Sequence, residues 1–299
     1  MKITNVLFGL LLLLCVACVQ SEKETPGGLK FSVLKAGDGK VGAPGQIMVA
    51  HLQIKDSKDS VWSDTYKDGM PIPIMIGDSA QAATEPKILQ VLRMISKGDS
   101  LVFTLPLRDF LGGQPPMPGM DTTLNMTCLM SVRDIMDRQA YEQYQMKLME
   151  DHAAKQLVKD IATIDAYLTE KGVQAVKTES GLRYVITKAG TGENGQPGQT
   201  ASVNYSGYTL EGKFFDSSVK EVAQANGLYN PGRPYQPYDV TIDQSQVIKG
   251  WHEALKLLSK GSKATVYIPS PLGYGAQQRS EVIVPNTILV FDMEIVDLK

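Results

Sequence analysis

The chain has 299 residues, with 30 Lys and Arg against 32 Asp and Glu, and its formal net charge is −2. Charges of both signs are mixed along the sequence without the basic face that nucleic acids need, so we expect no nucleic-acid partner. The histidines His51, His152 and His252 are scattered and make no ligand spacing, so we expect no metal and no cofactor. The length allows two ordinary domains.

The first residues predict export. Met1 and Lys2 precede an apolar run from Val6 to Leu14, which is the pattern of a secretory signal peptide and is too short to span a bilayer. We expect a signal peptide at residues 1–17.

The end of that run, LCVAC, resembles a bacterial lipoprotein box in which Cys18 receives the lipid. An ordinary signal peptide cleaved nearby is the alternative. Several acyl chains on Cys18 would anchor the protein to a bacterial membrane, where a single chain binds only marginally. Val19 is not the aspartate that marks inner-membrane retention in some bacteria, which favours the outer membrane.

Residues 18–28 are polar and end in turn-forming residues, so we expect a flexible tether. After processing, Cys128 would be the one cysteine without a lipid, and no internal disulfide could form. Its neighbours Met126, Leu129 and Met130 indicate a buried strand, and we interpret Cys128 as a small core residue rather than a nucleophile.

The sequence contains an internal repeat, which indicates two copies of one fold. Four pairs of segments match in the same order: 35–39 with 188–192, 44–46 with 197–199, 96–98 with 259–261, and 102–106 with 265–269.

Residues from Ile135 to Lys171 contain neither proline nor glycine and are rich in helix-forming residues, so we expect a helical linker at residues 136–176. One long helix or two shorter ones would fit, with Gly172 as the C-terminal stop. Its apolar stripe packs either on the chain's own domains or on a second chain in a homodimer, and the sequence leaves both open.

The second copy contains several separated motifs that agree in order and spacing with one family. They are Tyr205-x-Gly207, Gly212-x-x-Phe215-Asp216-Ser217-Ser218, Val247-Ile248-x-Gly250-Trp251, Ile268-Pro269, Leu272-x-Tyr274-Gly275, and Ile283-x-Pro285-Asn286-Thr287-x-Leu289-x-Phe291. This pattern resembles the FKBP family of peptidyl-prolyl cis-trans isomerases over roughly the last 120 residues.

The resemblance implies an α+β fold of two FKBP-like domains, each an antiparallel sheet curled around a short helix, joined by the helical linker. We expect the isomerase domain at residues 177–299 and a degenerate copy at residues 29–135. In the first copy, the cup positions carry other residues: Leu52, Trp62, Ser63, Glu85, Ile88 and Leu111 stand where the second copy has Tyr205, Phe215, Asp216, Ile248, Trp251 and Tyr274.

The resemblance also implies the roles of the site residues. A substrate proline would sit on Trp251, with Tyr205, Phe215, Val247, Ile248 and Phe291 as walls and Tyr238 at the rim. The Ile248 N–H and the Tyr274 hydroxyl would bind substrate carbonyls. Asp216 would orient Tyr205 or face the twisting carbonyl, and Val282 and Ile283 would close the far lip.

The stretch from Val219 to Gln236 is longer than the family norm and leads into the rim at Tyr238. It is a solvated surface loop, an added substrate contact or a partial cover of the pocket. We expect a peptidyl-prolyl isomerase that assists the folding of exported, proline-containing polypeptides that are unfolded or nascent. A non-catalytic holdase chaperone or peptide-binding lipoprotein is the alternative.

Overall fold

The computed structural model describes residues 21–77 and 86–299. The chain divides into two compact units, Met1–Gln145 and Met146–Lys299. The predicted signal peptide and lipidation site at Cys18 lie outside the described residues, and so does Glu85.

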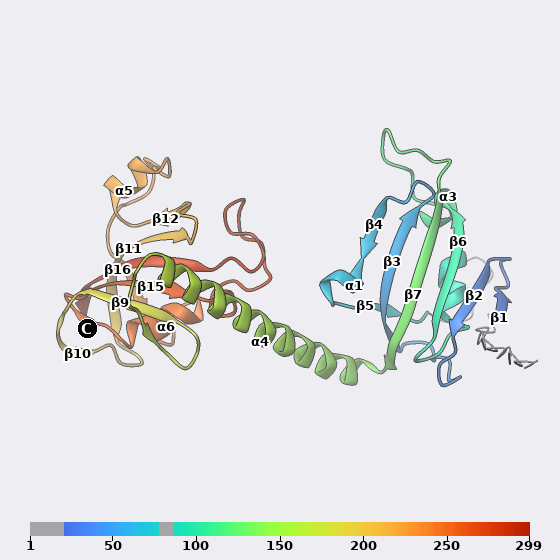
Figure 1. Ribbon diagram of the computed structural model, residues 1–299, viewed down its shortest axis with the longest axis horizontal. Coiled ribbons are helices and arrows are strands. Elements are labelled where there is room, and N and C mark those ends of the chain that lie inside the picture. The colour runs from blue at the N-terminus through green and yellow to red at the C-terminus, as the bar shows by residue number, and fades with distance from the viewer. Residues whose placement is uncertain (1–20, 78–85) are drawn as a thin grey trace, which may run out of the picture. The chain divides into compact units, whose positions relative to one another are not determined.

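The first unit is a seven-stranded antiparallel sheet with short helices (Figure 1). Its strands follow the order β1-β2-β6-β7-β3-β4, and β5 also pairs with β3. The elements are β1 Ser21–Glu24, β2 Lys30–Lys35, β3 Ile47–Asp56, β4 Val61–Asp64, α1 Thr65–Asp68, β5 Ile72–Met75, α2 Lys87–Leu92, β6 Ser100–Pro106, α3 Leu107–Phe110 and β7 Asn125–Met136.

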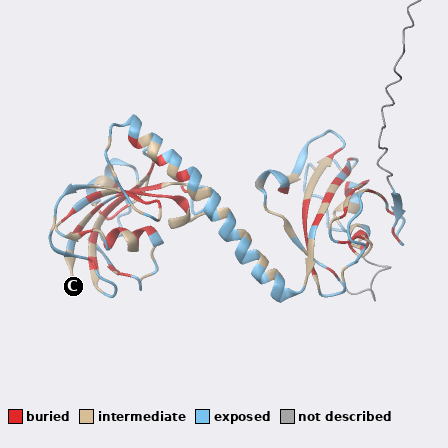
Figure 2. Cartoon of the chain, turned by 60° about the horizontal axis from the view of Figure 1, so that its bottom comes forward, coloured by how far each residue is buried: buried red, intermediate tan, exposed pale blue. Residues whose placement is uncertain are grey.

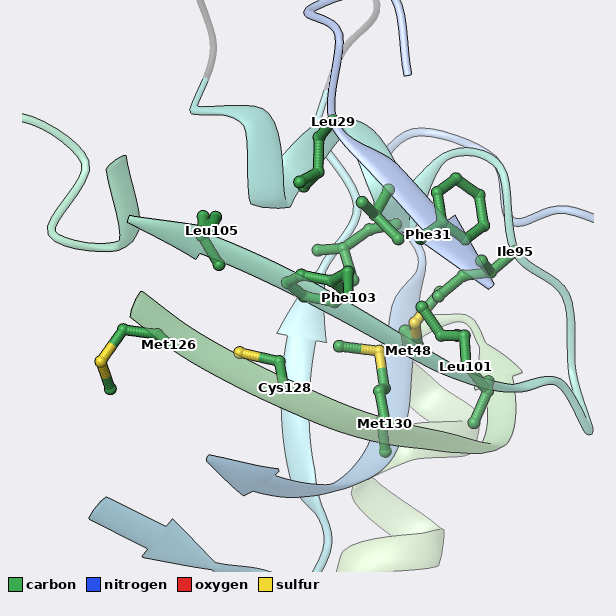
Figure 3. Close-up of a cluster of buried hydrophobic side chains, with 14 of the residues drawn as sticks. Leu29, Phe31, Met48, Ile95, Leu101, Phe103, Leu105, Met126, Cys128 and Met130 are labelled. Carbon is green, nitrogen blue, oxygen red and sulfur yellow. The ribbon is translucent and has the colours of Figure 1, made fainter. Parts of the chain in front are cut away.

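The core of this unit is formed by the side chains on one face of its sheet. In β6 and β7, every second side chain points to one face of the sheet, as the two-residue period of a strand requires. Figure 3 shows Leu101, Phe103 and Leu105 from β6 beside Met126, Cys128 and Met130 from β7, packed with Phe31 and Ile95. Cys128 is 1% exposed, which agrees with its interpretation as a core residue.

Part of the predicted tether is ordered. Residues Ser21 to Glu24 form β1, which pairs with β2 in antiparallel register. The backbone N–H of Gly27 also donates to the side chain of Gln90 at 2.7 Å. The expectation of a flexible segment is corrected for residues 21–24, because four polar, exposed side chains suit an edge strand that faces solvent on both sides.

The second unit contains another seven-stranded antiparallel sheet, in the order β8-β9-β15-β16-β11-β12, with β13 paired to β11. Strands β10 and β14 form a separate two-stranded pair. Helix α4 Arg138–Glu170 begins in the first unit and ends in the second. The other elements are β8 Val176–Lys177, β9 Arg183–Lys188, β10 Thr191–Asn194, β11 Thr200–Thr209, β12 Phe214–Ser217, α5 Lys220–Ala225, β13 Tyr238–Thr241, α6 Lys249–Leu255, β14 Ser259–Lys260, β15 Lys263–Ile268, the 3-10 helix η2 Ser270–Leu272 and β16 Leu289–Leu298.

The two sheets share their topology and their register. Gln53 lies opposite Asp64 in the first sheet, and the equivalent residues Ser206 and Ser217 lie opposite each other in the second. A bulge follows Val49 in β3 and, at the same place in the repeat, Ser202 in β11. The expected fold class, α+β with two sheets of this kind and a long helix, is confirmed.

Helix α4 is one helix of 33 residues rather than two shorter ones. Asp137 caps its N-terminus, since its carboxylate accepts the N–H of Ala140 at 2.8 Å. Gly172 ends it in the left-handed conformation with φ 65°, as predicted. Figure 2 shows that most of the helix is exposed. Its buried residues are Asp160, Ile164 and Leu168. No helix within residues 21–77 and 86–299 is both long and apolar enough to cross a membrane.

Candidate active site

The second unit has a cavity of about 830 Å³ between its sheet and α6. Its lining residues come from β11, β12, β13, α6, β16 and the loops around them. They are Tyr205, Phe215, Asp216, Tyr238, Gln246, Val247, Ile248, Lys249, Trp251, Gly273, Tyr274, Gln277, Arg279, Ser280, Ile283 and Phe291. Ten of the eleven residues predicted for the site therefore lie together in one cavity.

Aromatic rings in edge-to-face contact form the apolar part of the cavity. The Trp251 ring lies 4.9 Å from that of Tyr205 and 5.3 Å from that of Phe291, measured between centroids. Phe215 contacts Phe291 in the same way at 5.6 Å. Trp251 is only 5% exposed. Such contacts hold each ring in place, so the cavity keeps a fixed apolar surface.

Gly207 makes room for these rings. It lies opposite Phe291 in the pairing of β11 with β16 and opposite Asp216 in the pairing of β11 with β12. A Cβ atom at this position would lie 2.6 Å from Phe215 and 2.8 Å from Phe291. A glycine is therefore required here for the two aromatic rings to meet above the strand.

The start of α6 places two more site residues. Ile248 is the N-cap residue of this helix, with extended backbone angles, and its carbonyl accepts the N–H of Trp251 at 3.0 Å. Trp251 thus lies in the first turn, facing the sheet. Gly250 has to be a glycine, because a Cβ atom there would lie 2.5 Å from Ile268.

Asp216 is the centre of a polar cluster on the cavity wall. Its carboxylate accepts a hydrogen bond from the Tyr205 hydroxyl at 2.6 Å and another from the guanidinium of Arg233. Arg233 also donates to the Tyr205 hydroxyl at 3.0 Å. Burial, and then the hydrogen bond to Asp216, raises the pKa of Tyr205, so this hydroxyl stays protonated and can donate.

The far lip of the cavity comes from the loop between η2 and β16. Ile283 is buried and lines the cavity, and the guanidinium of Arg279 lies 4.9 Å from the centre of the Tyr274 ring. Val282 does not line this cavity. It faces a neighbouring hollow with Thr209 and Pro285. Its predicted place at the lip is corrected, because residues 280–283 form a bend in which the N–H groups of Arg279 and Ser280 donate to the Ile283 carbonyl.

The insertion from Val219 to Gln236 folds on itself. Its helix α5 is followed by a stack of Tyr229 on Tyr235, whose ring centroids lie 5.6 Å apart, and the Tyr235 hydroxyl accepts the N–H of Asn230 at 2.9 Å. None of its residues lines the cavity, so the insertion does not cover it. Arg233 is the residue through which the insertion contacts the site: its guanidinium binds the Asp216 carboxylate from outside the cavity.

Sequence reasoning did not find the polar residues around the cavity. Arg233, Gln246, Lys249, Gln277 and Arg279 belong to loops or exposed helix positions, where sequence patterns carry little information about direction. A signal was present for Arg233 only, as a cation within an insertion that leads into Tyr238 at the rim.

The first unit has different side chains at the equivalent places. Cys128 lies opposite Ile54 in the first sheet, at the place where Phe291 lies opposite Gly207 in the second. A small thiol therefore stands where the FKBP-like site has an aromatic ring. Trp62, at the position of Phe215, is 40% exposed and donates its indole N–H to Asp56 at 2.9 Å. These substitutions remove the aromatic box from that face.

The sequence profile of FKBP-type peptidyl-prolyl cis-trans isomerases matches residues 192–296, a range that contains every residue predicted for the site. The part of the second unit that this profile matches is an FKBP domain. A probable FKBP-type peptidyl-prolyl cis-trans isomerase of Haemophilus influenzae is 40% identical over 128 residues, which cover 43% of this chain and 47% of that protein. The outer membrane protein MIP of Legionella longbeachae is 33% identical over 167 residues, covering 56% of this chain and 62% of that one.

The crystal structure of FkpA from Escherichia coli is 31% identical, with a TM-score of 0.38, and the match covers 56% of this chain and 75% of that chain. The chain spans about half the length of the curated relatives it matches. The family assignment therefore rests on the FKBP domain, where the cavity lies.

Proposed function

We propose that the FKBP domain catalyses cis-trans isomerisation of peptide bonds that precede proline. The observation that carries this proposal is the cavity itself, in which aromatic rings from three strands and a helix line an open space beside a fixed carboxylate. No described residue needs to act as a nucleophile for this reaction, because no covalent bond is broken.

The physical basis is the charge distribution of the amide. Resonance gives the rotation barrier of ~18–20 kcal/mol, and the planar amide is more polar than the twisted one. An apolar site therefore disfavours the planar ground state relative to the perpendicular transition state. Contacts that hold the flanking peptide in one turn geometry increase this difference, and stabilisation gained only in the transition state raises the rate.

The proposed roles follow the positions of the side chains. The proline ring would sit on Trp251, between Tyr205 and Phe291. The Ile248 N–H and the Tyr274 hydroxyl would bind substrate carbonyls, while Asp216 would fix Tyr205 or face the twisting carbonyl. Tyr238, Val247 and Ile283 would contact the residues on either side of the proline.

The first unit is proposed to be a degenerate FKBP-like domain with little or no isomerase activity. Its sheet has the same order and register as that of the FKBP domain. Its Trp62 and Cys128, however, cannot form an aromatic box.

The protein is further proposed to be exported and anchored by lipid at Cys18, with the outer membrane as its site, and to act on proline-containing unfolded or nascent exported polypeptides. The pattern of residues 1–18 and the name of the Legionella relative support this. Labelling cells with a radioactive fatty acid tests the anchor: the wild-type chain should carry label, and a Cys18→Ser variant should not.

A homodimer through α4 is a separate proposal. Met146 and Met149 are 65% and 52% exposed and lie three residues apart, on the same face of the helix, which supports a partner helix. Sedimentation of the lipid-free protein tests it: the wild type should sediment as a dimer, and a Met146→Glu/Met149→Glu variant as a monomer.

The isomerase proposal is tested with a short X–Pro peptide whose cis-trans exchange is followed by NMR magnetisation transfer. The full chain should accelerate exchange well beyond the spontaneous rate of one event in tens to hundreds of seconds. Asp216→Ala should lower the acceleration. A wild-type protein that leaves the exchange rate unchanged would contradict the proposal.

The same preparations separate the enzyme from a holdase chaperone or peptide-binding lipoprotein, the alternative that the exposed methionines of α4 support. A holdase would suppress aggregation of an unfolded client equally well with and without an intact cavity, and it would not accelerate the exchange of the peptide. Acceleration that depends on Asp216 excludes a purely non-catalytic role.

A further inference from the structure

One buried carboxylate links α4 to the loop of the FKBP domain that carries Tyr274. Asp160 is 3% exposed, although it lies in a helix that is mostly exposed. Its Oδ2 accepts two hydrogen bonds from Ser270, one from the backbone N–H at 2.7 Å and one from the hydroxyl at 2.6 Å. Its Oδ1 accepts the side-chain amide of Gln156 at 2.7 Å.

Ser270 connects Asp160 to the backbone on both sides of Tyr274. Ser270 is fully buried at the start of η2, and its carbonyl accepts the backbone N–H of Gly273 at 2.9 Å and that of Gly275 at 2.8 Å. These two amides flank Tyr274, which lines the cavity. The N–H, hydroxyl and carbonyl of one serine thus connect the helix to both sides of the proposed substrate-binding tyrosine.

The rest of the contact between α4 and the domain supports this link. Ile164 and Leu168 are buried against Tyr267 and Val290, on strands of the sheet. Five residues beyond Asp160, Asp165 accepts two hydrogen bonds from the guanidinium of Arg183, at 2.9 and 3.3 Å. The helix is therefore held on the sheet independently of Asp160, and the Asp160 carboxylate is free to act on the loop.

We propose that Asp160 is a positioning residue for catalysis, which holds the Ser270–Gly275 turn so that the Tyr274 hydroxyl meets the substrate carbonyl. This inference rests on the proposed isomerase function. A buried carboxylate with hydrogen bonds to a single loop residue is costly to desolvate, and those bonds compensate only while the loop keeps this geometry. A loop that departs from it loses both bonds at once.

The kinetic test uses the full chain and the X–Pro peptide. Asp160→Ala is expected to lower kcat/KM about tenfold, because small displacements of a group that contacts substrate are costly. Asp160→Asn should restore most of the activity, since its amide oxygen can accept both bonds from Ser270 and Gln156 can turn its amide. Asp165→Asn is the matched control. It changes an aspartate on the same helix, removes its ion pair with Arg183 of β9, and should leave kcat/KM within about twofold.

A double-mutant cycle distinguishes positioning from general destabilisation. In a Tyr274→Phe background, Asp160→Ala should change kcat/KM by less than about twofold, since its effect passes through the tyrosine hydroxyl. An undiminished tenfold loss in that background would overturn the proposal.

Hydrogen exchange provides a readout that does not depend on activity. Asp160→Ala should speed exchange of the Gly273 and Gly275 amides, while the amides of β11 and β16 keep their protection. Unchanged exchange at both glycines would refute the positioning role. Faster exchange in a protein whose wild-type form does not accelerate the peptide would uphold the link to the loop and refute the isomerase proposal instead. If Asp160→Ala does not fold, Ser270→Ala removes the hydroxyl bond alone and should speed the same amides.

Discussion

Arg233 pairs with Asp216, although it comes from an insertion that contributes no residue to the cavity lining. Because it donates to the carboxylate and to the Tyr205 hydroxyl, it fixes both members of the pair from outside. The insertion therefore supports the polar wall of the site and leaves the opening clear.

Replacing Arg233 should weaken catalysis without abolishing it. Arg233→Ala removes two hydrogen bonds, but Tyr205 still donates to Asp216, so we expect kcat/KM for an X–Pro peptide to fall ~2- to 10-fold. Tyr229→Ala perturbs the same insertion away from Asp216 and should have little effect. Equal losses in both variants would show that the insertion acts as a whole.

The raised pKa of Tyr205 makes the stability of the fold depend on pH in a predictable direction. A group whose pKa is higher in the folded protein stabilises the fold below its ordinary pKa of about 10, and this contribution is lost as the pH rises above that value. Tyr205→Phe should cost about 1–2 kcal/mol at pH 8, and the gap from wild type should narrow above pH ~10. Urea unfolding between pH 8 and 11 measures it; a constant gap would argue against the raised pKa.

The contact between Asp165 and Arg183 should be sensitive to acid. The hydrogen bond from Arg183 lowers the pKa of Asp165 to about 2. Since a lowered pKa stabilises the fold above the ordinary value near 4, this contribution is lost as the pH falls from about 4 towards 2. Asp165→Asn should cost about 1 kcal/mol at pH 7, because the carboxylate is partly exposed, and almost nothing at pH 2. Unfolding curves of both proteins across this range provide the check.

Cys128 should resist thiol reagents in the native protein. Burial raises the pKa of its thiol to about 12, so the reactive thiolate is scarce at neutral pH. Iodoacetamide followed by peptide mass mapping should find Cys128 unmodified in buffer and modified in denaturant. Rapid native modification would mean that β6 and β7 open readily.

The sequence was sufficient to locate the cavity because its residues recur at fixed spacing around glycines that the packing requires. Gly207 and Gly250 each leave space that a Cβ atom would fill, and such positions mark the motif in the sequence itself. The repeat likewise predicted two copies of one fold, and the shared register of the two sheets is consistent with it, since strand pairing depends on the alternation of side chains.

Contacts between distant segments were not accessible in this way. Asp160 and Ser270 are 110 residues apart, and a lone aspartate on an amphipathic helix gives no sign that it is buried. Arg233 lies in a loop whose path depends on its own stack of tyrosines. Val282 was placed at the wrong side of the lip because the direction of one residue in an irregular segment depends on local backbone angles.

The two tryptophans of the chain provide the most direct test of the central claim. Trp251 lies in α6 and lines the cavity, whereas Trp62 lies in β4 of the first unit, at the position that Phe215 has in the second. Exchange of an X–Pro peptide should be measured with the full-length wild type, Trp251→Ala and Trp62→Ala at equal concentration. The account predicts that Trp251→Ala loses most of the acceleration, at least about tenfold, and that Trp62→Ala keeps it. Equal activity in the wild type and Trp251→Ala would contradict it.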